Sequence, residues 1–184
     1  MNVYDLIIIP CGSKKLAERS PAISLYQGAF FRACAKTADT LTAIDRRILS
    51  GKHGLLEYHV WVDPYEQRID KPGAITHEEL WQQAYDQGLL ERRMVLALCP
   101  SAYAKVVRQL WPKAFFPLVG MGGIGRQMQI LKEMRDAVER RAGSTQLSLG
   151  DMEEDHGGSH DRGRRRSPRP RVVCNADRPL DAGA

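Results

Sequence analysis

The predicted fold rests on the stretch Leu6-Ile7-Ile8-Ile9-Pro10-Cys11-Gly12-Ser13-Lys14-Lys15. Its first four residues form an apolar, β-branched run, which is typical of a parallel strand buried on both faces. Pro-Cys-Gly then ends the run in a tight turn that offers a thiol, a hydroxyl and two ammonium groups. Because ligands bind at the carboxyl ends of strands in open α/β sheets, this turn is the leading candidate for an anion-binding or catalytic loop.

The composition indicates a soluble globular protein. A chain of 184 residues with 43% apolar content is long enough for one domain with a proper core. It contains no apolar run of membrane-spanning length, and its first residues lack the basic region of a signal peptide, so we expect a cytoplasmic protein without membrane contact. The 4 cysteines include no CxxC pair, and we expect neither a metal site nor a cofactor.

The charge of the chain favours an anionic partner. The formal net charge is +5, and basic and acidic residues balance from Asp151 onward, so the whole excess lies in the preceding part of the chain. Such an excess suits a nucleotide or nucleic acid, although many proteins without such a ligand carry as much.

Strand-like and helix-like segments alternate along the first 142 residues. Strands are predicted at 3–9, 45–50, 93–99 and 114–119, and helices at 27–41, 76–89, 101–111 and 126–141. Thr76 and Glu79 form a capping-box pattern, and Ser101 is the expected cap of the third helix. The order predicts a three-layer α/β sandwich, with a mainly parallel sheet of four to five strands and helices on both faces. Residues 143–184 are expected to form a disordered tail, whose arginine-rich part (162–171) is either a solvated segment or a nucleic-acid contact.

Four loops follow the four predicted strands, at 10–15, 50–56, 99–103 and 120–127. In a parallel sheet they lie along one edge, so their polar groups are expected to converge. The last loop matches GxGxxG, but no strand with a ribose-binding acid follows it, which argues against a dinucleotide site. Its glycines either let backbone N–H groups approach a phosphate or simply satisfy turn geometry.

The polar residues of these loops and of the segment around Pro64 supply the candidate site. Cys11 is either an activated nucleophile or a small residue packed at the strand end, and Tyr26, Tyr65 and Tyr103 are stacking candidates or ordinary half-buried tyrosines. The expected catalytic residues are Glu66, His53 and Lys52. The expected substrate-binding residues are Cys11, Ser13, Lys14, Tyr26, Tyr65, Gly123, Gly125, Arg126 and Gln127.

Several of these pieces, in this order, resemble an uncharacterised domain family of bacterial and phage proteins. They are Cys11-Gly12-Ser13-Lys14-Lys15, Leu25-Tyr26-Gln27-Gly28-Ala29-Phe30, Ile48-Leu49-Ser50-Gly51-Lys52-His53-Gly54-Leu55-Leu56, Pro64-Tyr65-Glu66 and Gly123-Ile124-Gly125-Arg126-Gln127. Gly51 stands where the family usually has alanine, an exchange expected to be neutral. Glu66 stands where it usually has aspartate, which keeps the charge but moves it by one methylene.

That family is distantly similar to the uracil-DNA-glycosylase-like domain of archaeosine synthase and archaeal tRNA-guanine transglycosylase. The resemblance implies an α/β domain that binds a nucleobase or nucleotide and acts on its N-glycosidic bond. In that scheme Glu66 or His53 assists water or the leaving base, the lysines and the Gly123–Gln127 loop hold phosphate and base, and Tyr26 or Tyr65 stacks. The alternatives are a non-catalytic DNA- or RNA-binding module and a nucleotide transferase.

Overall fold

The computed structural model describes residues 4–150, with side chains to Gly143. Its centre is a four-stranded sheet in the order β4 (Gly54–Leu56), β3 (Ala43–Ser50), β1 (Tyr4–Pro10) and β6 (Val95–Ala97). β1 runs parallel to both β3 and β6, and β4 pairs antiparallel with β3. The structure therefore confirms a mixed α/β fold around a mainly parallel sheet.

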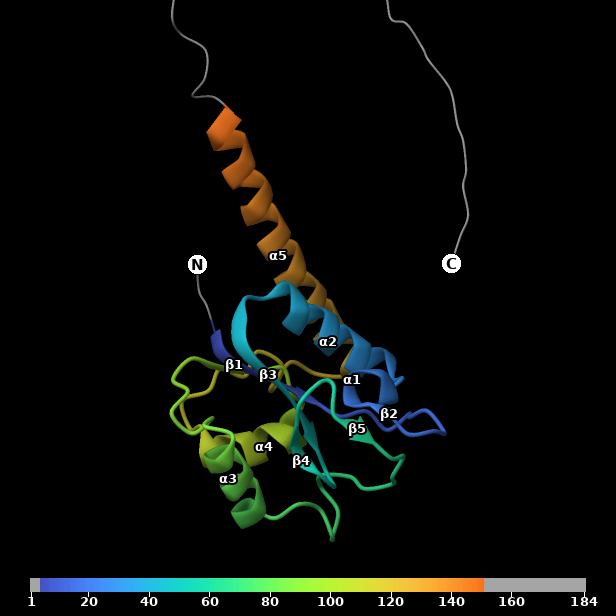
Figure 1. The fold of residues 1–184 in the computed structure, drawn as a ribbon. Coiled ribbons are helices and arrows are strands. Elements are labelled where there is room, and N and C mark those ends of the chain that lie inside the picture. The colour runs from blue at the N-terminus through green and yellow to red at the C-terminus, as the bar shows by residue number, and fades with distance from the viewer. Residues whose placement is uncertain (1–3, 151–184) are drawn as a thin grey trace, which may run out of the picture.

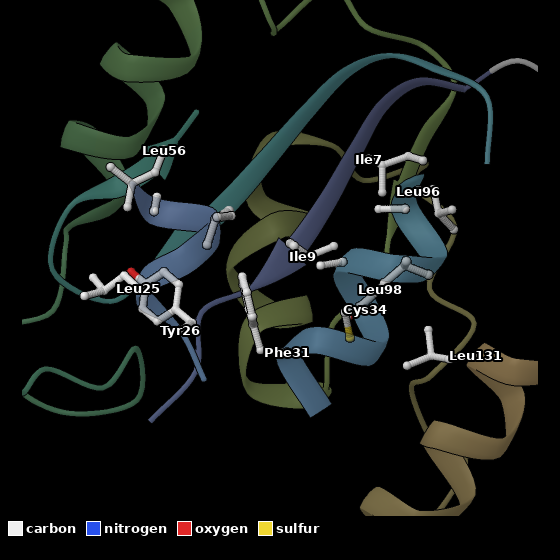
Figure 2. Close-up of a cluster of buried hydrophobic side chains, with 14 of the residues drawn as sticks. Ile7, Ile9, Leu25, Tyr26, Phe31, Cys34, Leu56, Leu96, Leu98 and Leu131 are labelled. Atoms are coloured by element: carbon white, nitrogen blue, oxygen red, sulfur yellow. The ribbon is translucent and has the colours of Figure 1, made fainter. Parts of the chain in front are cut away.

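Alternate residues of β1 enter two separate clusters of buried side chains. Ile7 and Ile9 pack with residues of α2 (Ala29–Thr40) and with Leu131 of α5 (Ile124–Gly150). Figure 2 shows this cluster. Leu6 and Ile8 pack with residues of α3 (His77–Asp86) and α4 (Ser101–Leu110). Since side chains alternate across a strand, α2 and α5 cover one face of the sheet while α3 and α4 cover the other (Figure 1).

The predicted strand at 114–119 is wrong in extent. Only Phe115 pairs there, in a bridge with Leu96 in which Phe115 donates to the carbonyl of Val95 and accepts from the amide of Ala97. Pro117, which lacks an N–H, prevents a longer ladder. Two short features that the sequence did not indicate are β4 and a small second sheet of β2 (Ser20–Pro21) and β5 (Trp61–Val62).

The helices agree with the predictions except at their ends. Thr76 and Glu79 form the expected capping box at α3. At α4 the cap position is occupied by Pro100, so Ser101 is the first helical residue and does not cap through its side chain. A short helix, α1 (Ala22–Leu25), precedes α2.

The long C-terminal helix changes the predicted boundary at residue 142. α5 continues to Gly150, so residues 143–150 belong to this helix rather than to a tail. Residues 151–184, where the rest of that tail was predicted, lie outside the described part of the chain. No helix between residues 4 and 150 has the length and apolar character that a membrane crossing requires.

Candidate functional site

A cleft of about 380 Å³ opens at the carboxyl ends of β1 and β6. Three segments form it: the loop after β1, the start of α4, and the irregular stretch that follows Tyr65. Its lining residues are Cys11, Gly12, Ser13, Lys15, Glu66, Gln67, Arg68, Ile69, Asp70, Pro100, Ala102 and Tyr103. The loops at 10–15 and 99–103 therefore meet as predicted, and Glu66 joins them as expected. Residues 67–70 extend that wall, which sequence reasoning did not foresee.

Main-chain hydrogen bonds hold the loop after β1 in place. The carbonyl of Lys14 accepts from the amide of Gln27, and the amide of Leu16 donates to the carbonyl of Leu25. Lys15, between them, forms a β-bridge with Tyr26. This pairing fixes the backbone of Lys15, so the orientation of its side chain is set by the fold.

At the floor of the cleft the thiol of Cys11 lies 3.1 Å from the phenol oxygen of Tyr103. Burial raises the pKa of Tyr103 well above its usual value. The phenol is therefore neutral at physiological pH and retains a proton that it can donate to the sulfur or to a ligand. Glu66, at the rim, is exposed, and within the described residues it makes no ion pair within 4.0 Å.

Beside the cleft, three hydroxyls form a chain of short hydrogen bonds. The Tyr65 oxygen lies 2.6 Å from Oγ of Ser50 and 2.7 Å from the Tyr26 oxygen. Ser50 Oγ also accepts from the backbone amides of Lys52 and His53, at 3.1 and 2.9 Å. Since these two amides occupy the acceptor sites of the serine oxygen, its proton is directed at Tyr65.

Three basic side chains surround the ring of Tyr65. The ammonium nitrogen of Lys15 lies 4.4 Å from the ring centroid and that of Lys52 lies 5.8 Å away. The imidazole of His53 meets the same ring edge-on at 4.9 Å. We call Ser50, Tyr65, Tyr26, Lys15, Lys52 and His53 the Tyr65 cluster. Lys15 is also a lining residue of the cleft, so it connects the two.

His53 is held as a neutral imidazole. Burial and the neighbouring ammonium of Lys52 lower its pKa, and the carboxylate of Asp63 opposes them only in part. Its Nε2 atom is buried and has no hydrogen-bond partner within the part of the chain that the structure describes. The same part of the chain contains no group of three or more His, Cys, Asp or Glu side chains placed to hold a metal ion.

Comparison with protein families matches residues 6–133, from β1 into α5, to DUF6884, a family of unknown function. The chain belongs to this family. Neither the curated proteins nor the solved structures contain a match to it. The cleft and the Tyr65 cluster both lie inside the matched region.

Within this DUF6884 domain, the predicted catalytic residues do not all share one cleft. Glu66 lines it, whereas Lys52 and His53 lie in the Tyr65 cluster and are not among its lining residues. Of the predicted binding residues, Cys11 and Ser13 line the cleft. Lys14 is exposed but is not part of the lining, and Lys15 lines the cleft where Lys14 was expected.

Tyr26 and Tyr65 do not fit the predicted stacking role in the DUF6884 domain. Tyr26 is 1% exposed and its ring packs against Phe31 at 5.0 Å (Figure 2). Tyr65 is 7% exposed, with the Lys15 ammonium over its ring. Neither ring offers a free face to a base. Tyr103, which is half-buried at the cleft, is the aromatic side chain that remains accessible.

The glycine loop before α5 does not line the cleft. Gln127 is buried, and its side-chain amide donates to the carbonyl of Gly122 at 2.9 Å. Arg126 is exposed and forms a 3.5 Å ion pair with Glu133 on the next turns of the helix. A Cβ added at Gly123 or Gly125 would meet nothing within 4 Å. The expected convergence of all four loops is therefore not observed in the lining of this cleft.

Gly51 connects the second loop to the cleft wall, where the neighbouring backbone leaves no room for the methyl group of an alanine. A Cβ at this position would lie 2.7 Å from the Ile69 nitrogen and 2.8 Å from the Arg68 carbonyl carbon. The backbone of residues 67–69 thus packs directly on Gly51. Sequence reasoning missed this contact and the role of Ser50 because both depend on residues distant in the chain. The run Leu49-Ser50-Gly51, in which small residues interrupt an apolar strand, was the available signal.

Proposed function

We propose that the cleft binds a nucleotide, either free or within a nucleic acid, and that the domain acts on its N-glycosidic bond. The observation that carries this proposal is the combination of groups around the cleft. One ammonium (Lys15), one carboxylate without an ion-pair partner in the described residues (Glu66) and one accessible phenol ring (Tyr103) face a volume of about 380 Å³. That volume falls in the usual range of small-ligand sites, about 300–1,000 Å³.

Each group suits one part of a nucleotide. The Lys15 ammonium neutralises a phosphate, supported by the first-turn N–H groups of α4, which begins at the cleft without a side-chain cap. The Tyr103 ring packs on the base. Arg68 is a poorer phosphate ligand, because its charge is already paired with Asp70 through two hydrogen bonds, at 2.9 and 2.8 Å.

The carboxylate of Glu66 supplies the chemistry. It accepts a proton from a water molecule as the water oxygen forms a bond to the anomeric carbon of the sugar. The bond from that carbon to the base nitrogen breaks, and the base leaves with the electron pair and takes a proton from solvent. The negative charge of Glu66 also stabilises the oxocarbenium-like transition state.

Support from fold analogy is weaker but points the same way. The sequence resembles a family distantly similar to uracil-DNA-glycosylase-like domains, which are three-layer α/β sandwiches linked to nucleobases. A three-layer arrangement would agree with the two core clusters on opposite faces of the sheet. The glycine loop before α5 would then contact an extended substrate outside the cleft.

One observation favours a second candidate, a non-catalytic nucleic-acid-binding module. Of the three residues expected to act in catalysis, only Glu66 lines the cleft. A site that merely binds has no need of Lys52 or His53 beside the carboxylate. In that case binding would fall steeply with salt concentration, because phosphate contacts release counterions.

Base release decides between the two. The full chain is incubated with nucleoside monophosphates, single-stranded DNA and RNA, and free base is measured by chromatography. We expect Glu66→Gln to abolish release while leaving nucleotide binding within a factor of about two, since the amide keeps the shape but not the basicity. Glu139→Gln, on the exposed side of α5, is the matched control. Salt-sensitive binding with no base release from the unmodified chain would favour the second candidate, and absence of both would overturn the proposal.

A further inference from the structure

A second and larger cleft, of about 1010 Å³, lies at the amino end of β6, whereas the first cleft lies beyond the carboxyl end of this strand. The two clefts share no lining residue. It is formed by the turn between α3 and β6, the end of α4 and the segment after it. Its lining residues are Leu90, Glu91, Arg92, Arg93, Val95, Leu110, Trp111, Pro112, Lys113 and Ala114. Nothing in the proposed function uses this cleft.

The walls of the second cleft are mostly apolar. Val95 and Trp111 are buried lining residues, 3% and 5% exposed. The indole N–H of Trp111 donates to the carbonyl of Leu89 at 3.1 Å. The partly buried side chains of Leu90, Leu110 and Ala114 pack against the same core cluster and complete the apolar part of the lining.

The rim of this cleft is positively charged. Arg93 and Lys113 are exposed and, within the described residues, take part in no ion pair within 4.0 Å. Glu91 is the acidic side chain among the lining residues, and Asp5 faces Arg93 from β1, with its carboxylate bonded to the backbone amides of Arg93 and Met94.

Arg92 adds a further positive charge to the lining of this cleft. Its Nη2 donates to Asp45 at 2.6 Å, but its Nε is buried and has no partner within the part of the chain that the structure describes. Because this Nε is enclosed, Arg92 contributes to the cleft through its charge and the exposed part of its side chain rather than through this atom.

We propose that this second cleft binds an amphipathic anion, that is, a molecule with an apolar chain or ring and a terminal carboxylate. The apolar part covers Trp111, Leu110 and Pro112. The carboxylate lies at the rim between Arg93 and Lys113. Cations are repelled there, and neutral apolar molecules gain burial without the charge-assisted contacts.

The test uses the full chain and three ten-carbon compounds below their micelle-forming concentrations: decanoate, decanol and decyltrimethylammonium. Binding is followed by NMR shifts of labelled protein and by calorimetry. We expect decanoate to bind more tightly than decanol by roughly tenfold, about 1.4 kcal/mol, and decyltrimethylammonium not to bind. The shifts should centre on Val95, Trp111 and Lys113 and leave Lys15 and Glu66 unchanged.

Charge-reversal variants complete the test. Lys113→Glu and Arg93→Glu change exposed side chains, so folding is expected to be unaffected, as circular dichroism would verify. Each should weaken decanoate about tenfold without changing decanol. Lys105→Glu, an exposed cation of α4 outside the cleft, is the matched control. Equal affinity for decanoate and decanol would overturn the proposal. So would unchanged decanoate binding in both variants, or NMR shifts centred on the first cleft.

Discussion

The hydroxyl of Ser50 lies 2.6 Å from the phenol oxygen of Tyr65 and also accepts two backbone amides. One small side chain at the end of β3 thereby fixes both the turn that carries Lys52 and His53 and the ring over which Lys15 lies. Ser50 is 0% exposed, so none of these partners is readily replaced by water.

Ser50→Ala should therefore destabilise the protein more than Tyr65→Phe. The alanine leaves two amides and a buried phenol without their partner, whereas the phenylalanine leaves the hydroxyls of Ser50 and Tyr26 short of one partner each while Ser50 keeps both amides. Both losses fall in the range of roughly 1–3 kcal/mol, with the alanine nearer the upper end. Urea unfolding of the two variants measures the difference. An equal or smaller loss for Ser50→Ala would contradict the assigned hydrogen-bond directions.

Gly51→Ala should destabilise the protein by about 1–3 kcal/mol, because the new methyl group overpacks the backbone of residues 67–69. Gly143→Ala is the control: it lies in α5 with nothing within 4 Å of its Cβ position, and alanine is the better helix former. We expect it to leave stability unchanged or slightly raised. Thermal unfolding of both variants is sufficient, and a neutral Gly51→Ala would show that the cleft wall can move aside.

His53 should make stability fall as pH is lowered. Its folded-state pKa is depressed, mainly by burial, so below its ordinary value of about 6.5 the unfolded chain takes up a proton more readily than the folded one. Above that pH both states are neutral and the residue has no effect. Melting temperatures between pH 8 and pH 5 should therefore decline more steeply for the unmodified chain than for His53→Gln. Parallel curves would be inconsistent with a depressed pKa.

The two helix starts should respond differently to loss of a hydroxyl. Thr76→Ala removes one half of the capping box of α3 and should cost about 1 kcal/mol. Ser101→Ala should change stability by less than about 0.5 kcal/mol, since this exposed residue is already inside α4 and its side chain caps nothing. Chemical unfolding compares them directly. A cost at Ser101 as large as at Thr76 would restore the capping role predicted from the sequence.

Lys15 and its neighbour Lys14 test the proposed phosphate site. Lys15→Met should weaken binding of a nucleoside monophosphate about tenfold, because a charge-assisted contact is lost. Lys14→Met, which alters an exposed ammonium outside the cleft lining, should leave binding nearly unchanged. Calorimetry with each variant provides the measurement. A larger effect at Lys14 would place the phosphate outside this cleft.

Elements governed by local patterns could be predicted from the sequence. The run Leu6–Ile9 specifies a strand buried on both faces, and all four residues are 0% exposed. The capping box at Thr76 involves residues three apart and formed as expected. By contrast, the apolar stretch around Phe115 has a strand-like pattern but only one residue pairs, because proline and the position of the neighbouring strand limit the ladder.

Parts of the candidate site were also predictable. The turn after β1 and the start of α4 meet because parallel strands end at the same edge. The role of each side chain could not be predicted, because it depends on burial that no local pattern reveals. Tyr26 and Tyr65 look like stacking residues in the sequence, yet both are packed inside the domain.

The sequence by itself determined that Cys11, Ser13 and the lysines after them stand at the end of a buried parallel strand, because hydrophobic periodicity and turn chemistry act over a few residues. Only the tertiary structure decided that Lys15 rather than Lys14 faces the cleft. The same holds for Ser50, which fixes Tyr65, and for Gly51, on which the backbone of residues 67–69 packs directly. The place of Lys15 depends on its bridge with Tyr26, and those of Ser50 and Gly51 depend on the close approach of residues 65–69 to the turn after β3. Packing between distant segments leaves no periodic signal in any of them.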